Sequence, residues 1–322
     1  MVWINLRFGQ KLLIKKESTY LASVFMLVIA GIIWGLSFTC VKWALVDFTT
    51  TQLLFYRFFV AFVLGEALLF ILKKDAWQKS HPDILLSLKP GLFLGVSLLF
   101  QIHGLHYTTA TNSAFITSIY VILIPFISIL LFKTSIKKMH FIFAALAFIG
   151  MAFLLDIPKM IGGNDPFKFN IGDLLTLGSA VTAAFQIIYI GLTAKKSVNT
   201  FRYNNYQTFW SLCVVIPFLI FESVQKNKSF IPETVHAQSL LGVGLLIVFV
   251  SMLAFYLQVT AQQKLSTATA SMLCLLEAPF SFLFAALLID EKLIGLQIFG
   301  AVLILSSSAL SVYVDRPQNG SH

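Results

Sequence analysis

The chain has 322 residues, of which 58% are hydrophobic and only 11% are charged, and its formal net charge is +9. A soluble globular domain carries about 25% charged residues. The composition therefore excludes a disordered chain, a coiled coil and a nucleic-acid-binding domain, and it argues against a water-soluble enzyme. Because the three cysteines lie in apolar runs away from any histidine cluster, we expect neither a metal site nor a disulfide framework. The composition favours a polytopic membrane protein without a cofactor.

Ten long apolar runs follow one another along the chain. A helix needs roughly 20 mostly apolar residues to cross about 30 Å of hydrocarbon, and its backbone groups satisfy one another where no water is present. We therefore predict an all-α integral membrane fold with ten transmembrane helices, at residues 22–45, 51–72, 90–106, 109–132, 139–156, 172–193, 203–222, 239–261, 266–289 and 293–313.

Residues 1–21 precede the first run and include several lysines. No small-residue cleavage site follows the run, so we interpret it as the first span rather than as a signal peptide. The basic segment before it allows two interpretations: a short interfacial helix with apolar residues such as Trp3 and Phe8 on one face, or a disordered tail. In both cases we expect this segment in the cytoplasm.

The basic residues are distributed unevenly over the predicted connections. With the N-terminus placed inside, the inner segments hold 16 lysines and arginines and the outer loops hold 5. Cytoplasmic loops of membrane proteins carry such an excess, so we predict cytoplasmic N- and C-termini. The basic charge is a topology signal, and no nucleic-acid partner is needed to explain it.

The two halves of the sequence resemble each other. Gln101 matches Gln258 at an offset of 157 residues, and Pro125 matches Pro279 at an offset of 154. Because five spans is an odd number, a second five-helix half enters the membrane from the opposite side. Inverted repeats are common in secondary transporters, whose substrate site lies near the midplane between the repeats. We predict two inverted five-helix repeats, at residues 22–157 and 172–314. An outer loop at 158–171 connects them, and a cytoplasmic tail follows at 315–322.

Ionisable residues inside spans are costly and are functional hypotheses by default. Glu277 lies near the middle of the ninth predicted span, two residues before Pro279. Proline lacks a backbone N–H and loosens a helix, so we predict that Pro279 and its counterpart Pro125 break their helices. A carboxylate beside irregular backbone suits proton coupling or the binding of a substrate amine. The alternative is a neutral or ion-paired glutamate that locks its helix to a neighbour.

Two basic residues, Lys42 and Arg57, lie toward the outer third of the first two spans and could hold a substrate carboxylate. The alternatives are that the Lys42 side chain extends to the outer interface and that Arg57 pairs with Asp47. Glu66 lies in the inner half of the second span and could pair with an inner-loop lysine. We take Lys42 and Glu277 as substrate-binding candidates.

Uncharged polar and aromatic residues complete the predicted site. Trp34 could stack on a substrate or bind a cation, or it could simply pack while Gly35 lets another helix approach. His103 is a candidate for substrate binding and for proton coupling, although a lone buried histidine is more often a packing residue. The remaining substrate-binding candidates are Gln101, Ser118, Tyr120, Gln186, Tyr189, Tyr256 and Gln258.

Six segments, in order and spacing, resemble the EamA-type family of the drug/metabolite transporter superfamily. They include IIWGLSFTCVKWAL at 32–45, ATNSAFITSIYVILIPF at 110–126 and AFYLQVTAQQKLSTATASMLCLLEAPF at 254–280. Where the family has Gly-Glu before its last span, this chain has Asp290–Glu291. The resemblance implies a ten-helix transporter of small metabolites, often amino acids, in a bacterial inner membrane. It also implies a cavity formed by helices 1, 3, 4, 6, 8 and 9.

We therefore predict a secondary active transporter that exports small polar metabolites, such as amino acids, by alternating access. No Walker-type loop ending in Gly-Lys-Ser/Thr occurs, so the chain does not itself hydrolyse ATP. Two alternatives are a passive membrane channel and an integral-membrane lipid-modifying enzyme, although the loops lack the clustered acids and histidines of such enzymes. The predicted partners are the small-molecule substrate and the lipid bilayer, and the protein could be a monomer or a homodimer.

Overall fold

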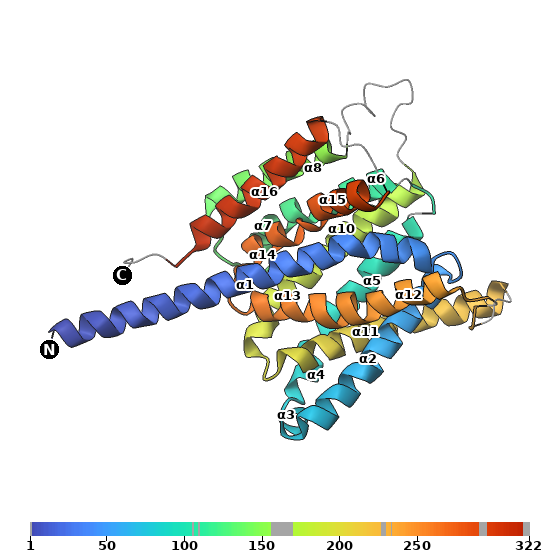
Figure 1. Ribbon diagram of the computed structural model, residues 1–322, viewed down its shortest axis with the longest axis horizontal. Helices are drawn as coiled ribbons and strands as arrows, with labels where there is room; N and C mark the ends of the chain where they lie inside the picture. The colour runs from blue at the N-terminus through green and yellow to red at the C-terminus, as the bar shows by residue number, and fades with distance from the viewer. Residues whose placement is uncertain are drawn as a thin grey trace.

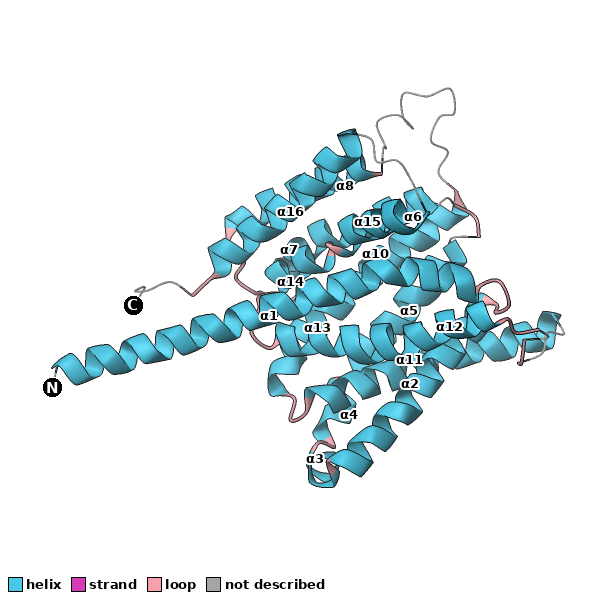
Figure 2. Ribbon diagram, viewed as in Figure 1, coloured by secondary structure: helices cyan, strands magenta, loops and turns pink. Residues whose placement is uncertain are grey.

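The computed structural model describes residues 2–104, 106–108, 110–155, 170–226, 230–232, 234–289 and 295–317, and every regular element within these ranges is a helix (Figure 1; Figure 2). The prediction of an all-α fold is therefore confirmed. Nearly all of the predicted connecting loop at 158–171 lies outside the described residues, as does most of the predicted C-terminal tail.

Seven predicted spans each form one helix: α1 Val2–Ala44, α2 Thr50–Leu72, α5 Leu88–Gly104, α8 Lys138–Leu154, α10 Ile171–Thr193, α11 Thr200–Lys226 and α16 Gly295–Asp315. The other three are divided into α6 Ala110–Thr117 with α7 Tyr120–Leu130, α12 Ala237–Leu245 with the π-helix η2 Leu246–Ala254 and α13 Phe255–Gln262, and α14 Thr267–Cys274 with α15 Glu277–Ile289. Short helices lie in the connections: α3 Lys74–Lys79, α4 Pro82–Leu86 and the 3-10 helix η1 Ala194–Lys196.

Within the described ranges, eight helical stretches are long and apolar enough to cross a membrane: Lys16–Ala44, Thr50–Leu72, Ser113–Leu130, Ile171–Lys196, Thr200–Gln225, Ala237–Gln262, Thr267–Phe284 and Gly295–Asp315. The other two predicted spans form α5 and α8, which have 17 residues each. The fold is that of a multi-pass membrane protein, while the count of ten spans stays a prediction.

The first helix is longer than the first predicted span. α1 is continuous from Val2 to Ala44 and projects beyond the bundle on its N-terminal side (Figure 1). Residues 10–21 contain no glycine or proline, so nothing in this stretch interrupts helical hydrogen bonding before the apolar run begins. The basic segment is thus helical and continuous with the first span rather than a coil, and its position at the membrane interface stays a prediction.

Two predicted spans are broken at matching places. α6 and α14 begin at Ala110 and Thr267, and the helices that follow the breaks begin at Tyr120 and Glu277. Both pairs are 157 residues apart, so one constant offset relates the two broken segments. The shift to an offset of 154 that the prolines suggested is not seen in the bounds of the helices.

The prediction that Pro125 breaks its helix is wrong, because Pro125 lies inside α7. The break comes earlier, in the turn that contains Ser118, whose hydroxyl donates to the Phe115 carbonyl oxygen at 2.6 Å. Such side-chain hydrogen bonds compete with the backbone pairing of a helix. Pro279 instead follows the second break and lies in the first turn of α15, where a missing N–H has little cost.

Close glycine contacts hold neighbouring helices together. Gly150 of α8 faces Gly300 of α16, and a Cβ added to Gly300 would lie 2.4 Å from the Gly150 carbonyl oxygen. Gly35 of α1 meets α15 in the same way, with an added Cβ 2.8 Å from the Cβ of Phe280. Small residues allow membrane helices to approach this closely. As a result, α1 packs against α15 and also along α12 and α13 (Figure 1).

Hydrogen bonds and ion pairs between connections show which of them lie together at the same end of the bundle. At one end of the bundle, which we call the termini end, Asp315 contacts Lys137 and Ser266. The 45–49 connection marks the opposite end, where Asp47 accepts hydrogen bonds from His236. The start of the α1 span and the end of α16 both lie at the termini end (Figure 1). The described connections that these contacts join thus lie at two opposite ends of the bundle.

Candidate functional site

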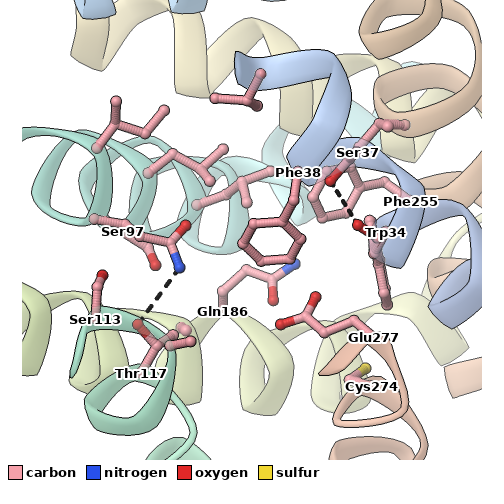
Figure 3. Close-up of a pocket in the computed structure, with 18 of the residues that line it drawn as sticks. Trp34, Ser37, Phe38, Ser97, Ser113, Thr117, Gln186, Phe255, Cys274 and Glu277 are labelled. Atoms are coloured by element: carbon pink, nitrogen blue, oxygen red, sulfur yellow. Dashed lines mark hydrogen bonds between the residues drawn. The ribbon is translucent and has the colours of Figure 1, made fainter. Parts of the chain in front are cut away.

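A cavity of about 260 Å³, which we call the central cavity, lies among the helices (Figure 3). Its lining comes from α1, α2, α5, α6, α7, α10, η2, α13, α14 and α15. The polar and charged residues of the lining are Ser37, Lys42, Arg57, Ser97, Gln101, Ser113, Thr117, Tyr120, Gln186, Gln258, Cys274 and Glu277, and its aromatic residues include Trp34, Phe38 and Phe255.

Along the first span and α5, the central cavity extends from mid-depth toward the end of the bundle opposite the termini. α1 lines it from Trp34 to Lys42, Leu45 lines it directly after α1, and α5 lines it from Leu94 to Ile102. Trp34 is ten residues from the end of α1 at Ala44, which corresponds to about 15 Å along a helix, or half of the ~30 Å hydrocarbon core. The lining includes no α1 residue before Trp34, whereas on the termini side it extends to Ile187 of α10 and Gln258 of α13.

Seven of the predicted substrate-binding residues line this cavity: Trp34, Lys42, Gln101, Tyr120, Gln186, Gln258 and Glu277. The predicted helices 1, 3, 4, 6, 8 and 9 all contribute to the lining. The second predicted span also contributes, through Arg57 of α2, which the sequence had suggested only as one of several possible carboxylate-binding residues.

Four predicted residues do not line the cavity. His103 places its Nδ1 3.1 Å from the Leu99 carbonyl oxygen, one turn earlier in the same helix. Ser118 donates to the backbone at the break before α7. Tyr189 stacks with Phe93, their ring centroids 5.5 Å apart. Tyr256 lines a separate groove at the termini end.

Glutamines at repeat-related positions make similar contacts in each half of the chain, on the wall of the cavity. The Gln101 amide nitrogen lies 3.4 Å from the Thr117 hydroxyl (Figure 3), and the Gln258 amide nitrogen lies 3.9 Å from the Cys274 sulfur. Each residue of the first pair is 157 residues before its counterpart in the second. Gln186 also donates to Gln258 at 3.4 Å. Repeat-related positions therefore make similar contacts on the wall of one cavity.

The Glu277 carboxylate points into the central cavity, close to the Gln186 amide (Figure 3). Among the described residues it has no hydrogen-bonding or ion-pair partner. The alternative in which Glu277 is ion-paired and locks its helix to a neighbour therefore lacks a partner within these ranges. A carboxylate in this position can bind a cation or exchange a proton with whatever enters the cavity.

Arg57 is buried, with only 5% of its surface exposed, and its Nε donates to the Ser251 hydroxyl at 2.8 Å. No carboxylate of the described residues pairs with it. The predicted partner, Asp47, instead binds His236 at 2.8 Å, and the Ser239 side chain and the His236 N–H lower the pKa of Asp47 to about 2. The predicted pairing of Arg57 with Asp47 is therefore wrong.

Glu66, the fourth charged residue of the predicted spans, binds side chains that do not line the central cavity. Its carboxylate accepts hydrogen bonds from the Trp77 indole and the Asn205 amide, and it lies 3.6 Å from the Arg202 guanidinium. Its basic partner is thus a residue of α11 rather than an inner-loop lysine. Arg57, Lys42 and Glu277 remain as the charged groups of the central cavity.

Several lining residues were not predicted, including Ser37, Ser97, Ser113 and Phe255. Helical spacing could have found some of them, because residues four apart lie on the same face of a helix. Ser97 precedes the predicted Gln101 by four residues, and Ser113 precedes Thr117 by four. Searching for small polar residues at this spacing would have extended the predicted site.

The EamA-like transporter family matches the chain over residues 21–156 and 170–313. An uncharacterized transporter of Archaeoglobus fulgidus is 32% identical over 279 residues, which cover 87% of this chain and 82% of that protein. The uncharacterized transporter YetK of Bacillus subtilis is 28% identical over 204 residues, which cover 62% of this chain and 59% of YetK.

A solved crystal structure has the same fold, with a TM-score of 0.72 at 16% sequence identity, and the match covers 91% of this chain and 97% of that one. At this identity the likeness concerns the fold alone, whereas the family match extends over both halves of the chain. The chain belongs to the EamA-like transporter family of the drug/metabolite transporter superfamily.

Proposed function

We propose that the protein is a secondary active transporter that exports small polar metabolites across a bacterial inner membrane by alternating access. The observation that carries this proposal is the central cavity, which is lined by both halves of the chain and by the charged residues Lys42, Arg57 and Glu277, none of which has an ion-pair partner among the described residues. Secondary transporters bind their substrates near the midplane, between inverted repeats.

The proposal includes ten spans in two inverted halves of five. The family match divides into two ranges, 21–156 and 170–313, and the two broken segments α6–α7 and α14–α15 follow one constant offset. Among the described residues, the connections at 45–49 and 131–137 lie at opposite ends of the bundle, which supports helices that cross it. Because the termini end carries most of the basic residues, it faces the cytoplasm in this proposal.

In this orientation the walls that α1 and α5 give the central cavity lie in the outer half of the membrane. Toward the termini end the cavity is followed by fully buried apolar side chains, among them Leu27, Val121 and Ile124. Buried apolar side chains on this side close the cavity toward the termini end. This supports an outward-facing state of a transporter rather than a continuously open channel. For an exporter, this is the state that releases the substrate.

The charges of the cavity favour a substrate with both a carboxylate and an amine. Arg57 and Lys42 supply cations that can bind a carboxylate, and Glu277 supplies an anion that can bind an ammonium group. Trp34 and Phe255 have ring centroids 5.5 Å apart and give the cavity an aromatic wall for an apolar side chain. Amino acids and related solutes combine these groups.

The test is solute exchange in proteoliposomes that contain the purified protein, with a panel of labelled amino acids. We expect saturable uptake of at least one solute, accelerated by the same unlabelled solute inside the vesicles. Flux that does not saturate and is not accelerated would favour a channel. No flux of any solute above that of empty vesicles would contradict the proposed function.

Glu277 is the proposed proton-exchanging group, because its carboxylate faces the cavity without a partner among the described residues. Glu277→Gln keeps the shape of the side chain but cannot release a proton. We expect this variant to lose the pH dependence of net transport while it retains some exchange, and the matched variant Asp75→Asn, at an exposed acid in α3, to behave as wild type. Wild-type transport by Glu277→Gln at every pH would exclude proton coupling through this residue.

A further inference from the structure

A second cavity, of about 440 Å³, lies between α2 and the π-helical segment, near the termini end. We call it the lateral groove. Its walls are apolar and come from Leu68, Leu69 and Leu72 of α2 and from Val248, Met252 and Leu253 of η2. Several of these side chains are exposed, including Leu72 at 72% and Val248 at 48%, so the groove faces the surroundings of the bundle rather than its core.

The polar residues of the lateral groove all lie at one end of it. Lys73, Asn199 and Tyr256 belong to its lining. Lys73 directly follows α2, and Tyr256 directly follows the first residue of α13, so each stands on the termini side of the apolar wall formed by its own segment. The groove therefore changes from polar to apolar along one direction, from the membrane surface toward its middle.

These three residues offer hydrogen-bond donors that the protein leaves unused. Among the described residues, neither the Lys73 ammonium nor the Tyr256 hydroxyl has a hydrogen-bonding or ion-pair partner. Asn199 uses its amide oxygen to accept from the N–H groups of Phe201 and Arg202, which leaves its amide nitrogen as a donor. Donors without acceptors suit a ligand that carries acceptors, such as phosphate and ester oxygens.

The surroundings of this polar end are basic. Lys74 and Lys79 of α3 are exposed, as are Lys195 and Lys196 of η1 at the same end of the bundle. Asp75 is the exposed acid among them, and the nearby Glu66 carboxylate is engaged by Trp77, Asn205 and Arg202. Basic residues beside a membrane surface attract anionic lipids by roughly 1 kcal/mol each, although this general attraction does not by itself create a site.

We propose that the lateral groove binds one anionic phospholipid of the leaflet at the termini end. Its phosphate and ester oxygens accept hydrogen bonds from Lys73, Asn199 and Tyr256, and an acyl chain lies along the leucines of α2 and the apolar side chains of η2. This assignment gives Tyr256 a lipid-binding role in place of the substrate-binding role predicted from sequence. It rests on the membrane location of the chain and does not depend on the proposed substrate.

The same π-helix connects this site to the central cavity. Met252 and Leu253 line the lateral groove, while the adjacent Ser251 accepts a hydrogen bond from Arg57 of the cavity. π-helical turns are uncommon and frequently occur at functional sites. A lipid in the groove therefore contacts the segment that positions Arg57, and we expect an anionic lipid to change the apparent affinity of the cavity for its substrate.

The test is native mass spectrometry of the full-length protein, titrated with phosphatidylglycerol or with phosphatidylcholine of the same acyl chains. We expect tighter binding of phosphatidylglycerol to one site. Lys73→Gln with Tyr256→Phe should weaken that binding about tenfold, as expected from the loss of a hydrogen bond to a charged group. The matched variant Lys79→Gln, at an exposed lysine outside the groove lining, should bind as wild type.

A second variant separates the groove from general surface charge. Leu253→Trp leaves the charges unchanged and fills the apolar part of the groove, so it should also weaken phosphatidylglycerol binding. In a separate measurement, free glycerol phosphate should fail to displace phosphatidylglycerol from the wild-type protein. Each variant is compared at a matched thermal unfolding midpoint. Equal binding of both lipids, or an equal loss of binding in the double variant (Lys73→Gln with Tyr256→Phe) and in Lys79→Gln, would overturn the proposal, even if solute exchange in proteoliposomes succeeds.

Discussion

Arg57 is the most unusual residue of the structure, because its guanidinium is buried without a carboxylate partner among the described residues. A buried unpaired charge is costly. Its Nε is held by Ser251, and the other donors of a guanidinium remain available to the cavity that Arg57 lines. This arrangement orients the side chain before a substrate arrives and suits recognition of a planar carboxylate.

Replacing this guanidinium tests its role in binding. Arg57→Gln should raise the KM for carboxylate-bearing substrates about 10- to 100-fold, since a hydrogen bond to a charged group contributes roughly 1.5–3 kcal/mol. The KM for the corresponding carboxamides should change little. Measurements of initial exchange rates in proteoliposomes decide this, with Arg316→Gln as a control at an exposed arginine of the termini end. An equal rise in KM for acids and amides would contradict carboxylate recognition by Arg57.

The sequence predicts the charged residues of the site better than its neutral residues. Glu277 and Lys42 stand out because few charged residues occur in apolar runs. His103 and Tyr189 were chosen by residue type, but whether such a side chain faces a cavity depends on the rotation of its helix. That rotation is set by packing, such as the stacking of Tyr189 on Phe93, which a single sequence does not reveal.

Helix contacts mediated by glycine determine the stability of the bundle. An added Cβ at Gly300 would lie 2.4 Å from the Gly150 carbonyl oxygen, whereas an added Cβ at Gly244 of α12 meets nothing within 4 Å. Gly300→Ala should therefore destabilise the protein by about 1–3 kcal/mol through overpacking. Gly244→Ala should be neutral or stabilising, because alanine favours a helix over glycine by about 1 kcal/mol.

Thermal unfolding in detergent compares the two alanine variants directly. A lower midpoint for Gly300→Ala alone is the predicted result. If both variants unfold at the wild-type midpoint, the contact between α8 and α16 is looser than the structure has it. If both unfold early, the effect belongs to glycine replacement in general.

The connection between α1 and α2 should give the protein a pH-dependent stability. Hydrogen bonds from Ser239 and from the His236 N–H lower the pKa of Asp47 to about 2, compared with about 3.9 for an aspartate in an unfolded chain. A carboxylate with a lowered folded-state pKa stabilises the fold above about pH 4, and this contribution is lost as the pH falls toward 2.

Asp47→Asn should therefore lower the unfolding midpoint at neutral pH, and the gap to wild type should close between about pH 4 and pH 2. Asp75→Asn, at an exposed aspartate of α3, is the control and should follow wild type throughout. A gap between Asp47→Asn and wild type that stays constant down to pH 2 would show that the Asp47 carboxylate does not stabilise this connection.

The positions of the helices were predictable because apolar runs of membrane length can be located directly in the sequence. The breaks inside the helices were not. The break before α7 occurs at Ser118 rather than at Pro125, because a proline can be accommodated in a helix when its neighbours satisfy the freed carbonyl. The π-helix at Leu246–Ala254 has no sequence signature either, since its residues are ordinary apolar helix formers apart from one serine.

The molecule as a whole combines two similar halves around one off-centre cavity. The sequence predicted the halves from a few matched residues, and the constant offset of 157 residues between Gln101 and Gln258, Thr117 and Cys274, and Tyr120 and Glu277 brings each pair to the same cavity. The asymmetry of the cavity was not predictable, because a sequence with two related halves is compatible with states open to either side. The lateral groove was not predictable either, since its polar residues come from separate connections.

The central claim is that solute passes through the central cavity, and one pair of variants tests it most directly. Ala183 of α10 lines the cavity, whereas Val181, two residues earlier, is exposed and does not. The measurement is labelled-solute exchange in proteoliposomes by Ala183→Trp and Val181→Trp, both reconstituted to equal protein content. We predict that Ala183→Trp abolishes exchange while Val181→Trp retains the wild-type rate. Wild-type exchange by a correctly folded Ala183→Trp would contradict the account, because the solute would then take another path.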